Sequence, residues 1–340
     1  MAKTILGVDI GHDRLKLALV RGTRVLKTAT APMPENLLRE GRITSRESMG
    51  ELIRTTMKEN AIRANQAAIV LTNDSVFIKN VQMPRMTIDQ LQYNLPFEFN
   101  DYITGELRDY VFDYAVVSES GAEANPEDGE AGSEGGATME LMAVGTLREV
   151  VEDVTQVLRK AGLRLVLAAP SVSAYIALIR AQREKLSAVA EEYGILDLGY
   201  ESIRMYMFRG DRHVATRALE IGLSSLDSVL ADAYGVDVHL AHTYLLTNFE
   251  NCQQREECHT AYENIAVELM RALNFYRFSN PDSALADLWL CGGGAVIEPL
   301  AEVLGDMLNI QLHPASELVP GGEGIEESNS YAQAIGITMG

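Results

Sequence analysis

One stretch near the N-terminus combines residue types that can hold a phosphate group and a divalent cation. In Ile5–Val20 an apolar run delivers Asp9 and then Gly11, and a short polar turn leads into a second apolar run that contains Lys16. A carboxylate at the end of a buried strand, followed by turn amides, can form a cradle for phosphate and Mg²⁺. Aspartate and glycine also occur in turns for conformational reasons alone, so one copy is weak support.

A second copy of the pattern lies in Tyr193–Phe208. Asp197 and Gly199 have the same spacing there, and Arg204 occupies the place of the earlier lysine. In each copy the basic residue follows the aspartate by seven positions (16 − 9 and 204 − 197). The repeat favours a ligand role for both aspartates over turn capping. For Lys16, a role near the ligand and a role as a solvated strand residue are equally compatible with the pattern.

A glycine triplet offers a third place for a ligand. Gly292, Gly293 and Gly294 lie between a short apolar run, Leu288–Leu290, and a helical pattern from Ala295. Glycines between a strand and a helix N-terminus let a planar or anionic ligand approach the backbone. A plain turn at such a place needs one glycine or two, so three in a row favour a ligand.

The elements that must position these residues repeat in two halves. Each half opens with a three-stranded meander, over Thr4–Ala31 and over Gly194–Leu219, and helices with apolar residues on one face follow. Ser45 is a suitable N-cap for the first helix. The predicted helices are Arg46–Ala61, Leu147–Ala161, Ser224–Tyr234, Val238–Leu246 and Tyr262–Phe278, with a closing helix over Ser330–Met339.

The segment Pro84–Val144 interrupts the first half. It contains a short helix over Thr87–Tyr93, much of the aromatic content of the chain, and an alternating strand over Tyr110–Val117. Residues 118–138 are rich in glycine and acidic residues and contain no lysine or arginine, so we expect a flexible acidic loop. A loop insertion between two strands is the simpler interpretation, and an acidic docking arm is the alternative.

Length and charge limit the possible functions. The chain has 340 residues, a formal net charge of −19 and three cysteines. This length favours two lobes, and the negative charge disfavours nucleic acid as a partner. Few cysteines indicate a reducing compartment. The N-terminal MAKTILGVD lacks the apolar core of a signal peptide, and no run of about 18 apolar residues occurs, so we expect a cytoplasmic protein without direct membrane insertion.

Two Asp-x-Gly meanders and a late strand–glycine–helix unit resemble the actin-like nucleotide-binding proteins, which include actin, sugar kinases and the division protein FtsA. The resemblance narrows to the PilM family of type IV pilus assembly proteins on several longer stretches. These are GRITSRESMGELI, VQMPRMTIDQLQYNLPFEFNDYI, DYVFDYAVV, RALEIGLSSLDSVLADAYGV and ALNFYRFSN. The absence of a basic amphipathic tail before Gly340 favours this family over FtsA.

The resemblance implies an α/β fold with two actin-like, ribonuclease H-like lobes and a small α+β subdomain inserted in the first. Its implied first lobe covers residues 1–165, with residues 84–144 as the insertion. The second lobe covers residues 166–328, and a C-terminal helix over residues 329–340 returns to the first lobe.

The resemblance also implies an ATP or ADP site with Mg²⁺. The two aspartates, Asp9 and Asp197, would hold Mg²⁺ largely through water. The nucleotide-binding residues carried over from the family are Asp9, Gly11, His12, Lys16, Asp197, Gly199, Gly222, Gly292, Gly293 and Gly294.

Some positions depart from the actin-like pattern. Relatives commonly have small hydroxyl residues in the first phosphate turn, where this chain has His12 and Asp13, and a second carboxylate there would repel phosphate. His242 and Leu245 replace the glutamate and lysine that often contact the adenosine. The stretch APSVSAYIAL lacks the acidic or amide residue that would position a water for hydrolysis, so at most slow ATP hydrolysis is expected.

For partners, the resemblance implies the cytoplasmic N-terminal tail of PilN, a membrane-anchored pilus protein. Family members hold this tail in a groove formed with the inserted subdomain, here within Pro84–Val117. Binding would place the protein at the inner membrane through its partners, with other pilus assembly proteins and self-association as further contacts. The alternatives are an active actin-like ATPase, a small-molecule kinase and an FtsA-like filament. The predicted apolar anchors are Leu95, Phe97, Phe99 and Tyr102, of which at least half must pack the subdomain core.

Overall fold

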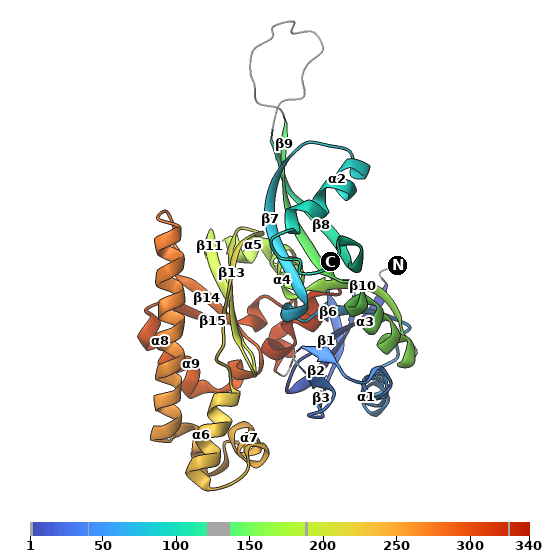
Figure 1. The fold of residues 1–340 in the computed structure, drawn as a ribbon. Coiled ribbons are helices and arrows are strands. Elements are labelled where there is room, and N and C mark those ends of the chain that lie inside the picture. The colour runs from blue at the N-terminus through green and yellow to red at the C-terminus, as the bar shows by residue number, and fades with distance from the viewer. Residues whose placement is uncertain (1–2, 40, 121–136, 188–189, 326) are drawn as a thin grey trace, which may run out of the picture.

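The computed structural model describes residues 3–39, 41–120, 137–187, 190–325 and 327–340. Two lobes, each built on a five-stranded sheet, lie side by side, and a small subdomain projects from the first (Figure 1). This arrangement confirms the predicted two-lobed α/β fold. No helix of the described residues is long and apolar enough to cross a membrane.

The first sheet has the strand order β10-β6-β1-β2-β3. Strands β1 to β3 form the predicted antiparallel meander, and β6 and β10 add to it in parallel. Helices α1 and α3 pack against each other beside this sheet. The elements are β1 (Thr4–Ile10), β2 (Arg14–Arg21), β3 (Arg24–Pro32), β4 (Leu38–Arg39), β5 (Arg42–Ile43), α1 (Arg46–Glu59), β6 (Gln66–Leu71), α3 (Arg148–Lys160) and β10 (Arg164–Pro170).

Helix α1 shows how local sequence sets these elements. The side chain of Ser45 accepts a hydrogen bond from the backbone N–H of Ser48, which confirms the predicted N-cap. Met49, Ile53 and Met57 recur at helical spacing and are buried in the core of the first lobe. The helix is therefore held by one apolar face.

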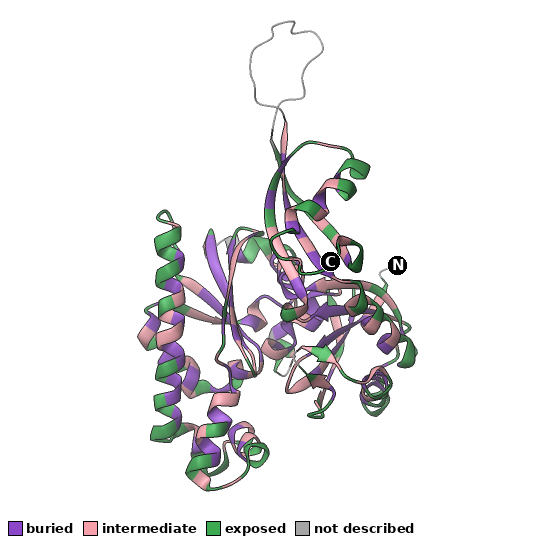
Figure 2. Ribbon diagram, viewed as in Figure 1, coloured by how far each residue is buried: buried purple, intermediate pink, exposed green. Residues whose placement is uncertain are grey.

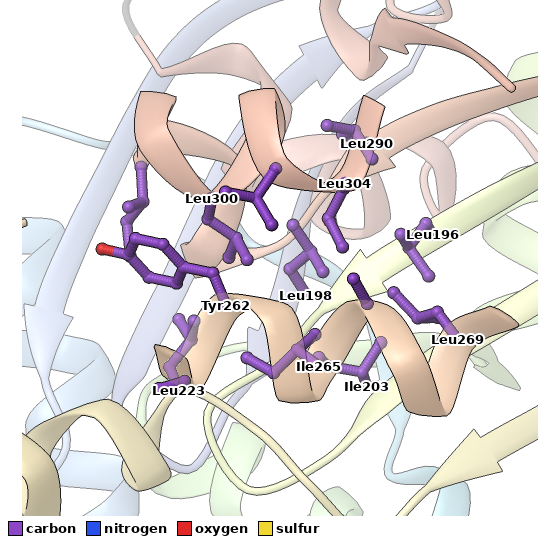
Figure 3. Close-up of a cluster of buried hydrophobic side chains, with 14 of the residues drawn as sticks. Leu196, Leu198, Ile203, Leu223, Tyr262, Ile265, Leu269, Leu290, Leu300 and Leu304 are labelled. Atoms are coloured by element: carbon purple, nitrogen blue, oxygen red, sulfur yellow. The ribbon is translucent and has the colours of Figure 1, made fainter. Parts of the chain in front are cut away.

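The second sheet repeats the first, with the order β13-β12-β11-β14-β15. Its core lies between the sheet and helices α8 and α9, where leucine and isoleucine side chains from strands and helices interdigitate (Figure 3). The helix predicted from Ala295 begins at Glu298 instead. A 3₁₀ turn over Gly293–Val296 precedes it, and Pro299 lies in the first turn of the helix. The elements are β11 (Glu192–Leu198), β12 (Ile203–Arg209), β13 (Arg212–Leu219), α6 (Ser224–Tyr234), α7 (Val238–Thr247), α8 (Glu256–Ser279), β14 (Asp287–Cys291), α9 (Glu298–Leu308) and β15 (Gln311–Pro314).

The inserted subdomain is a three-stranded antiparallel sheet with the order β7-β9-β8, covered by α2. It begins before residue 84, because β7 pairs with β9 from Val76 onward. The predicted loop starts later than residue 118, since β8 continues to Ser120; residues 121–136 lie outside the described part of the chain. The elements are β7 (Val76–Pro84), α2 (Ile88–Asn94), β8 (Tyr110–Ser120) and β9 (Thr138–Leu147).

Two helices connect the lobes. Helix α4 (Ser171–Ala181) follows β10 and is succeeded by the short α5 (Arg183–Ser187), while α10 (Ala332–Gly336) returns near the C-terminus. The two helices pack on each other and on the first sheet, and they share a buried cluster with strands of both lobes. Because β10 belongs to the first sheet, the predicted boundary at residue 165 falls inside a strand and must move past Pro170.

Close backbone approach fixes the position of α10. A side chain at Gly7 of β1 would place its Cβ 1.7 Å from the carbonyl oxygen of Ala334. A side chain at Gly336 would place its Cβ 2.3 Å from the carbonyl oxygen of Ala174 in α4. Figure 2 shows buried residues on α4, at the centre of the molecule, and α10 packs on α4 and on β1. These close approaches join α10 to β1 of the first lobe and to α4.

Candidate functional site

The two repeated hairpins contribute to one cavity of about 200 Å³ in the cleft between the lobes. In β1–β2, Asp9 pairs in register with Lys16, and in β11–β12, Asp197 pairs in register with Arg204. Their turns bring both aspartates to the cavity wall. Eight of the ten predicted nucleotide-binding residues line it: Asp9, Gly11, His12, Lys16, Asp197, Gly199, Gly292 and Gly293.

Asp9 is a buried carboxylate with a cation close by. The Nζ atom of Lys16 lies 3.8 Å from Asp9 Oδ2, and both side chains are largely buried. Burial raises the pKa of Asp9, nearby Asp197 raises it further, and Lys16 partly offsets both effects. A divalent cation between the two aspartates would relieve this repulsion, so the donor set fits Mg²⁺.

Asp197 is held by the C-terminal helix. The amide Nε2 of Gln333 donates to Asp197 Oδ2 at 2.6 Å and to the hydroxyl of Tyr175 at 2.9 Å. The amide oxygen of Gln333 accepts from Ser171 Oγ at 2.8 Å. Burial raises the pKa of Asp197, which Lys16 and these hydrogen bonds only partly counter. Gln333 therefore positions Asp197, and its own polar atoms are already engaged.

The glycine triplet divides into two roles. Gly292 has a φ of +86°, and a Cβ there would lie 2.5 Å from Asp197 Oδ1, so only glycine fits beside the aspartate. Gly293 lies on the cavity wall. A Cβ at Gly294 would instead meet Leu198 and Leu223 side chains, at 2.8 and 2.9 Å. Gly294 thus allows close packing behind the cavity. It is not among the residues that line the cavity, where it was expected to contact a ligand.

Gly222 also lies behind the cavity. A Cβ there would lie 2.2 Å from the carbonyl oxygen of Tyr200, so the residue supports the turn between β11 and β12. That turn is further held by the N–H of Leu223, which donates to the carbonyl of Gly199 at 3.1 Å. In the first hairpin the N–H of Gly11 donates to the carbonyl of Arg14 at 3.0 Å. Gly11 therefore uses its amide to close its own turn.

The residues that depart from the actin-like pattern form contacts across the cleft. Asp13 Oδ1 lies 2.9 Å from His242 Nε2, and His12 Nε2 lies 3.2 Å from Glu201 Oε2. Burial opposes ionisation of Asp13, but His242 outweighs it and lowers the pKa of Asp13. The carboxylate of Asp13 thus contacts His242 of the second lobe. A positively charged partner reduces the repulsion that was expected between Asp13 and a phosphate group.

Sequence reasoning missed several residues of the cleft. Asp74, after β6, accepts from Arg204 Nη2 at 2.7 Å, and its neighbour Asn73 donates to the hydroxyl of Tyr206 at 2.8 Å. Gln333 was assigned only to a closing helix. These contacts join segments far apart in the chain, so spacing gives no signal for them. For Gln333, a polar residue among alanine, isoleucine and glycine was the available hint.

Part of the cavity wall is apolar. Leu223, Leu245, Leu246 and Val296 contribute to it, and His242 also lines the cavity. Such a wall can accept the flat face of a nucleobase, while the aspartates, Lys16 and the turn residues remain for phosphate and metal. The residues present fit a nucleotide with Mg²⁺, and His242 and Leu245 lie on the cavity wall.

The comparisons with known proteins decide the family. The model of the family described as type IV pilus assembly protein PilM matches residues 7–321. The chain belongs to the PilM family. A solved PilM–PilN type IV pilus biogenesis complex is 22% identical with a TM-score of 0.82, covering 100% of this chain and 98% of the other.

A second solved structure supports the same fold. The ethanolamine utilisation protein EutJ from Carboxydothermus hydrogenoformans is 14% identical with a TM-score of 0.61, covering 100% of this chain and 90% of the other. Comparison with curated protein sequences finds no significant match. The fold of this PilM family member is therefore the two-lobed actin-like ATPase fold.

The inserted subdomain of this PilM family member buries two of its four predicted anchors. Leu95 and Phe99 are in the subdomain core, with Phe99 packed against Phe112 at a ring distance of 5.2 Å. Phe97 and Tyr102 are 49% and 46% exposed. Leu95 and Phe99 are thus removed from the candidate partner surface, because their side chains hold the subdomain together.

A second cavity, of about 110 Å³, lies at the root of the inserted subdomain. It is bounded by the β4–β5 hairpin and the start of α3, and Arg42 Nη1 lies 3.9 Å from Glu149 Oε2 beside it. Ser75, just before β7, contributes to the wall. Its apolar lining consists of Ile10, Leu38, Ile43, Ile69, Val70, Leu71, Val150 and Val154.

Proposed function

We propose that this PilM family member is a nucleotide-binding scaffold of the type IV pilus machine. It binds ATP or ADP with Mg²⁺ in the cleft and holds the cytoplasmic N-terminal tail of a PilN-like inner-membrane protein. Nucleotide occupancy sets the closure of the lobes and thereby the affinity for the tail. The protein acts in the cytoplasm and reaches the inner membrane through this partner.

One observation carries the nucleotide role: Asp9, Asp197 and Lys16 line the same cavity, and Lys16 lies beside Asp9. Burial raises the pKa of both aspartates, and their negative charges repel each other. A cation between the two carboxylates would relieve this repulsion. Gly292 keeps the space beside Asp197 free of a side chain. These features support a metal-assisted phosphate site.

Support for the tail site comes from the second cavity. An extended peptide with alternating apolar side chains needs a concave apolar surface with a few polar groups at its edge. The cavity at the root of the subdomain has this composition, with Arg42 and Glu149 at its edge. We therefore place the tail there, with the exposed Phe97 and Tyr102 as the competing surface.

The nucleotide role is tested by thermal unfolding with and without MgATP. A ligand at about 100 times its dissociation constant stabilises the native state by about 2.7 kcal/mol, which raises the melting temperature. The double variant Asp9→Ala with Asp197→Ala should lose this rise. A variant of the exposed ion pair residue Glu257, Glu257→Ala, serves as the control and should keep it. An unchanged rise in the double variant would contradict the assignment.

The tail role is tested by calorimetry with a peptide copying the N-terminal tail of a PilN-like protein. Val150→Arg should reduce the affinity at least tenfold, because it fills the cavity with a charged side chain. Phe97→Ala and Tyr102→Ala should leave it unchanged. Loss of binding in the aromatic variants alone would move the tail to the subdomain surface. Absence of binding to the unmodified protein, with and without MgATP, would reject the scaffold role.

A further inference from the structure

Within the part of the chain that the structure describes, histidine–carboxylate contacts bridge the cleft at three places. In each contact the histidine and the carboxylate come from different lobes, so each one joins the meander side of the first lobe to the second lobe. The pairs are His12 with Glu201, Asp13 with His242, and Glu35 with His239.

The middle contact is built differently from the outer two. His242, on α7, lies 2.9 Å from Asp13 through Nε2 and 2.9 Å from Asp227 through Nδ1. Asp227, on α6, is 1% exposed, and His242 is 17% exposed. Tyr200 packs edge-on against the imidazole with a ring distance of 5.3 Å. One imidazole thus joins a buried carboxylate of its own lobe to the first turn of the other lobe.

The bridge lies away from the helices that connect the lobes. On the connecting side, Asn73 donates to Ser171 of α4 at 3.3 Å, and Arg204 contacts the adjacent Asp74. The histidine bridge instead joins the β1–β2 turn to α7. A rotation about α4 and α10 that moves α7 away from the β1–β2 turn would therefore break the histidine bridge.

The cavity volume fits a closed cleft. Small-molecule sites typically have volumes of roughly 300–1,000 Å³, and this cavity has about 200 Å³. The Asp13–His242 contact joins the first turn to α7 at the wall of this cavity. Moving these two elements apart therefore requires the loss of this contact.

We propose that the Asp13–His242–Asp227 bridge is a latch that holds the lobes closed without any ligand. A positively charged imidazole between two carboxylates makes a charge-assisted hydrogen bond with Asp227 and a close ion pair with Asp13. The burial of Asp227 reduces screening by solvent. The latch is a property of this chain's own residues, so it stands or falls independently of the proposed nucleotide and tail sites.

The protonation of His242 supports the latch. Asp13 and Asp227 raise the pKa of His242 to about 9, although burial opposes this. A raised histidine pKa means that the contact is fully present below the ordinary value of 6.5 and is lost as the pH rises through about 9. The groups that face the imidazole are Asp13 from the β1–β2 turn, Asp227 from α6 and Tyr200 from the β11–β12 turn, and Arg14 and Lys16 face Asp13 in turn.

The test measures the distance between the lobes in the full chain without nucleotide. Nitroxide labels at Thr23→Cys in the first lobe and Asp232→Cys in the second report it by pulsed electron resonance, since the three native cysteines are buried. The closed protein should give one narrow distance distribution at pH 7.5. His242→Gln and Asp13→Asn should each raise the population at longer distance roughly tenfold, because each removes a charge-assisted contact.

His239→Gln is the matched control. It also removes a cross-lobe histidine on α7, but His239 and Glu35 are 68% and 71% exposed, so the distance distribution should stay closed. Raising the pH to 10 should open the unmodified protein and leave His242→Gln unchanged. Circular dichroism at each condition shows that the lobes remain folded.

Two results would overturn the latch. One is an identical distance distribution in the unmodified protein, His242→Gln and Asp13→Asn. The other is equal opening in His239→Gln and His242→Gln, which would assign closure to general surface charge. If a variant does not fold, the comparison of the unmodified protein at pH 7.5 and pH 10 decides: a closed distribution at both would reject the latch.

Discussion

The hairpins β1–β2 and β11–β12 have the same register and different surroundings. In both, the aspartate at the strand end is paired with a basic residue on the next strand, Asp9 with Lys16 and Asp197 with Arg204. In the first hairpin the lysine stays beside its own aspartate at 3.8 Å. In the second the arginine extends to Asp74 of the other lobe at 2.7 Å.

Because Arg204 contacts Asp74, Asp197 is positioned by residues outside its own hairpin. Gln333 of α10 donates to it, and Gly292 approaches it from β14. The first hairpin is thus a local unit, whereas the second is connected to the first lobe and to the C-terminal helix. A repeat in sequence therefore predicts the positions of the aspartates but not the residues that support them.

The largest effect on stability is expected at Gly292, whose backbone lies against Asp197 of the second hairpin. Gly292→Ala should lower the free energy of unfolding by about 4 kcal/mol, from about 2 for the left-handed backbone and about 2 for the overlap with Asp197. Gly210→Ala is the control, because Gly210 has a φ of +57° and nothing within 4 Å of a Cβ. It should cost about 1 kcal/mol in urea unfolding. Equal losses in both variants would contradict the close approach to Asp197.

A smaller effect separates the two basic residues. Lys16→Met should cost about 3 kcal/mol, because it leaves the buried Asp9 without its nearest cation. Arg204→Met should cost about 1 kcal/mol, since Asp74 is half-exposed and can be solvated when the arginine is lost. Urea unfolding of both variants provides the measurement. A larger loss in Arg204→Met would show that the cross-lobe contact is the stronger one.

The finest difference lies in the pH dependence of stability. Burial raises the pKa of Asp197, so the unmodified protein loses stability from this group as the pH rises above 3.8 and through the raised value. Asp197→Asn should therefore gain stability relative to the unmodified protein between pH 4 and pH 7.

Asp211→Asn provides the opposite sign for comparison. A hydrogen bond from Arg180 lowers the pKa of Asp211, so this carboxylate stabilises the folded state above its unfolded pKa of about 3.8. Its variant should lose stability relative to the unmodified protein as the pH rises from about 2 to about 5, a range that spans the lowered value and 3.8. Urea unfolding at the two ends of each pH range gives the two differences. The same sign in both variants would contradict the desolvation of Asp197.

Regular patterns predicted much of this fold. The alternating apolar residues of the two meanders, and the helical spacing of Met49, Ile53 and Met57, depend on contacts close in sequence. The repeat of Asp9 and Asp197 predicted a ligand role for each aspartate, and the resemblance to actin-like proteins implied that the two share one site. The elements and the ligand roles required only local periodicity and the repeat, whereas the shared site required the resemblance.

Other features depend on tertiary contacts that no spacing encodes. Gly222 and Gly294 look like ligand-binding glycines, but close backbone and side-chain packing explains them. Leu95 and Phe97 are near neighbours in one 3₁₀ turn, yet one is buried and the other exposed. The role of His242 depends on Asp13, which is over two hundred positions away (242 − 13). Such partners become visible only when the lobes are in place.

The return of α10 has a consequence for biosynthesis. Ala334 and Ile335 of α10 share a buried cluster with residues of β2, and Ile337, just after the helix, packs with Ala68 and Val70 of β6. The first lobe therefore lacks part of its core until these residues leave the ribosome. The apolar surface of the first sheet therefore stays exposed while the second lobe is translated. Nascent chains arrested after β15 should accordingly remain sensitive to protease in a lobe whose strands were made first.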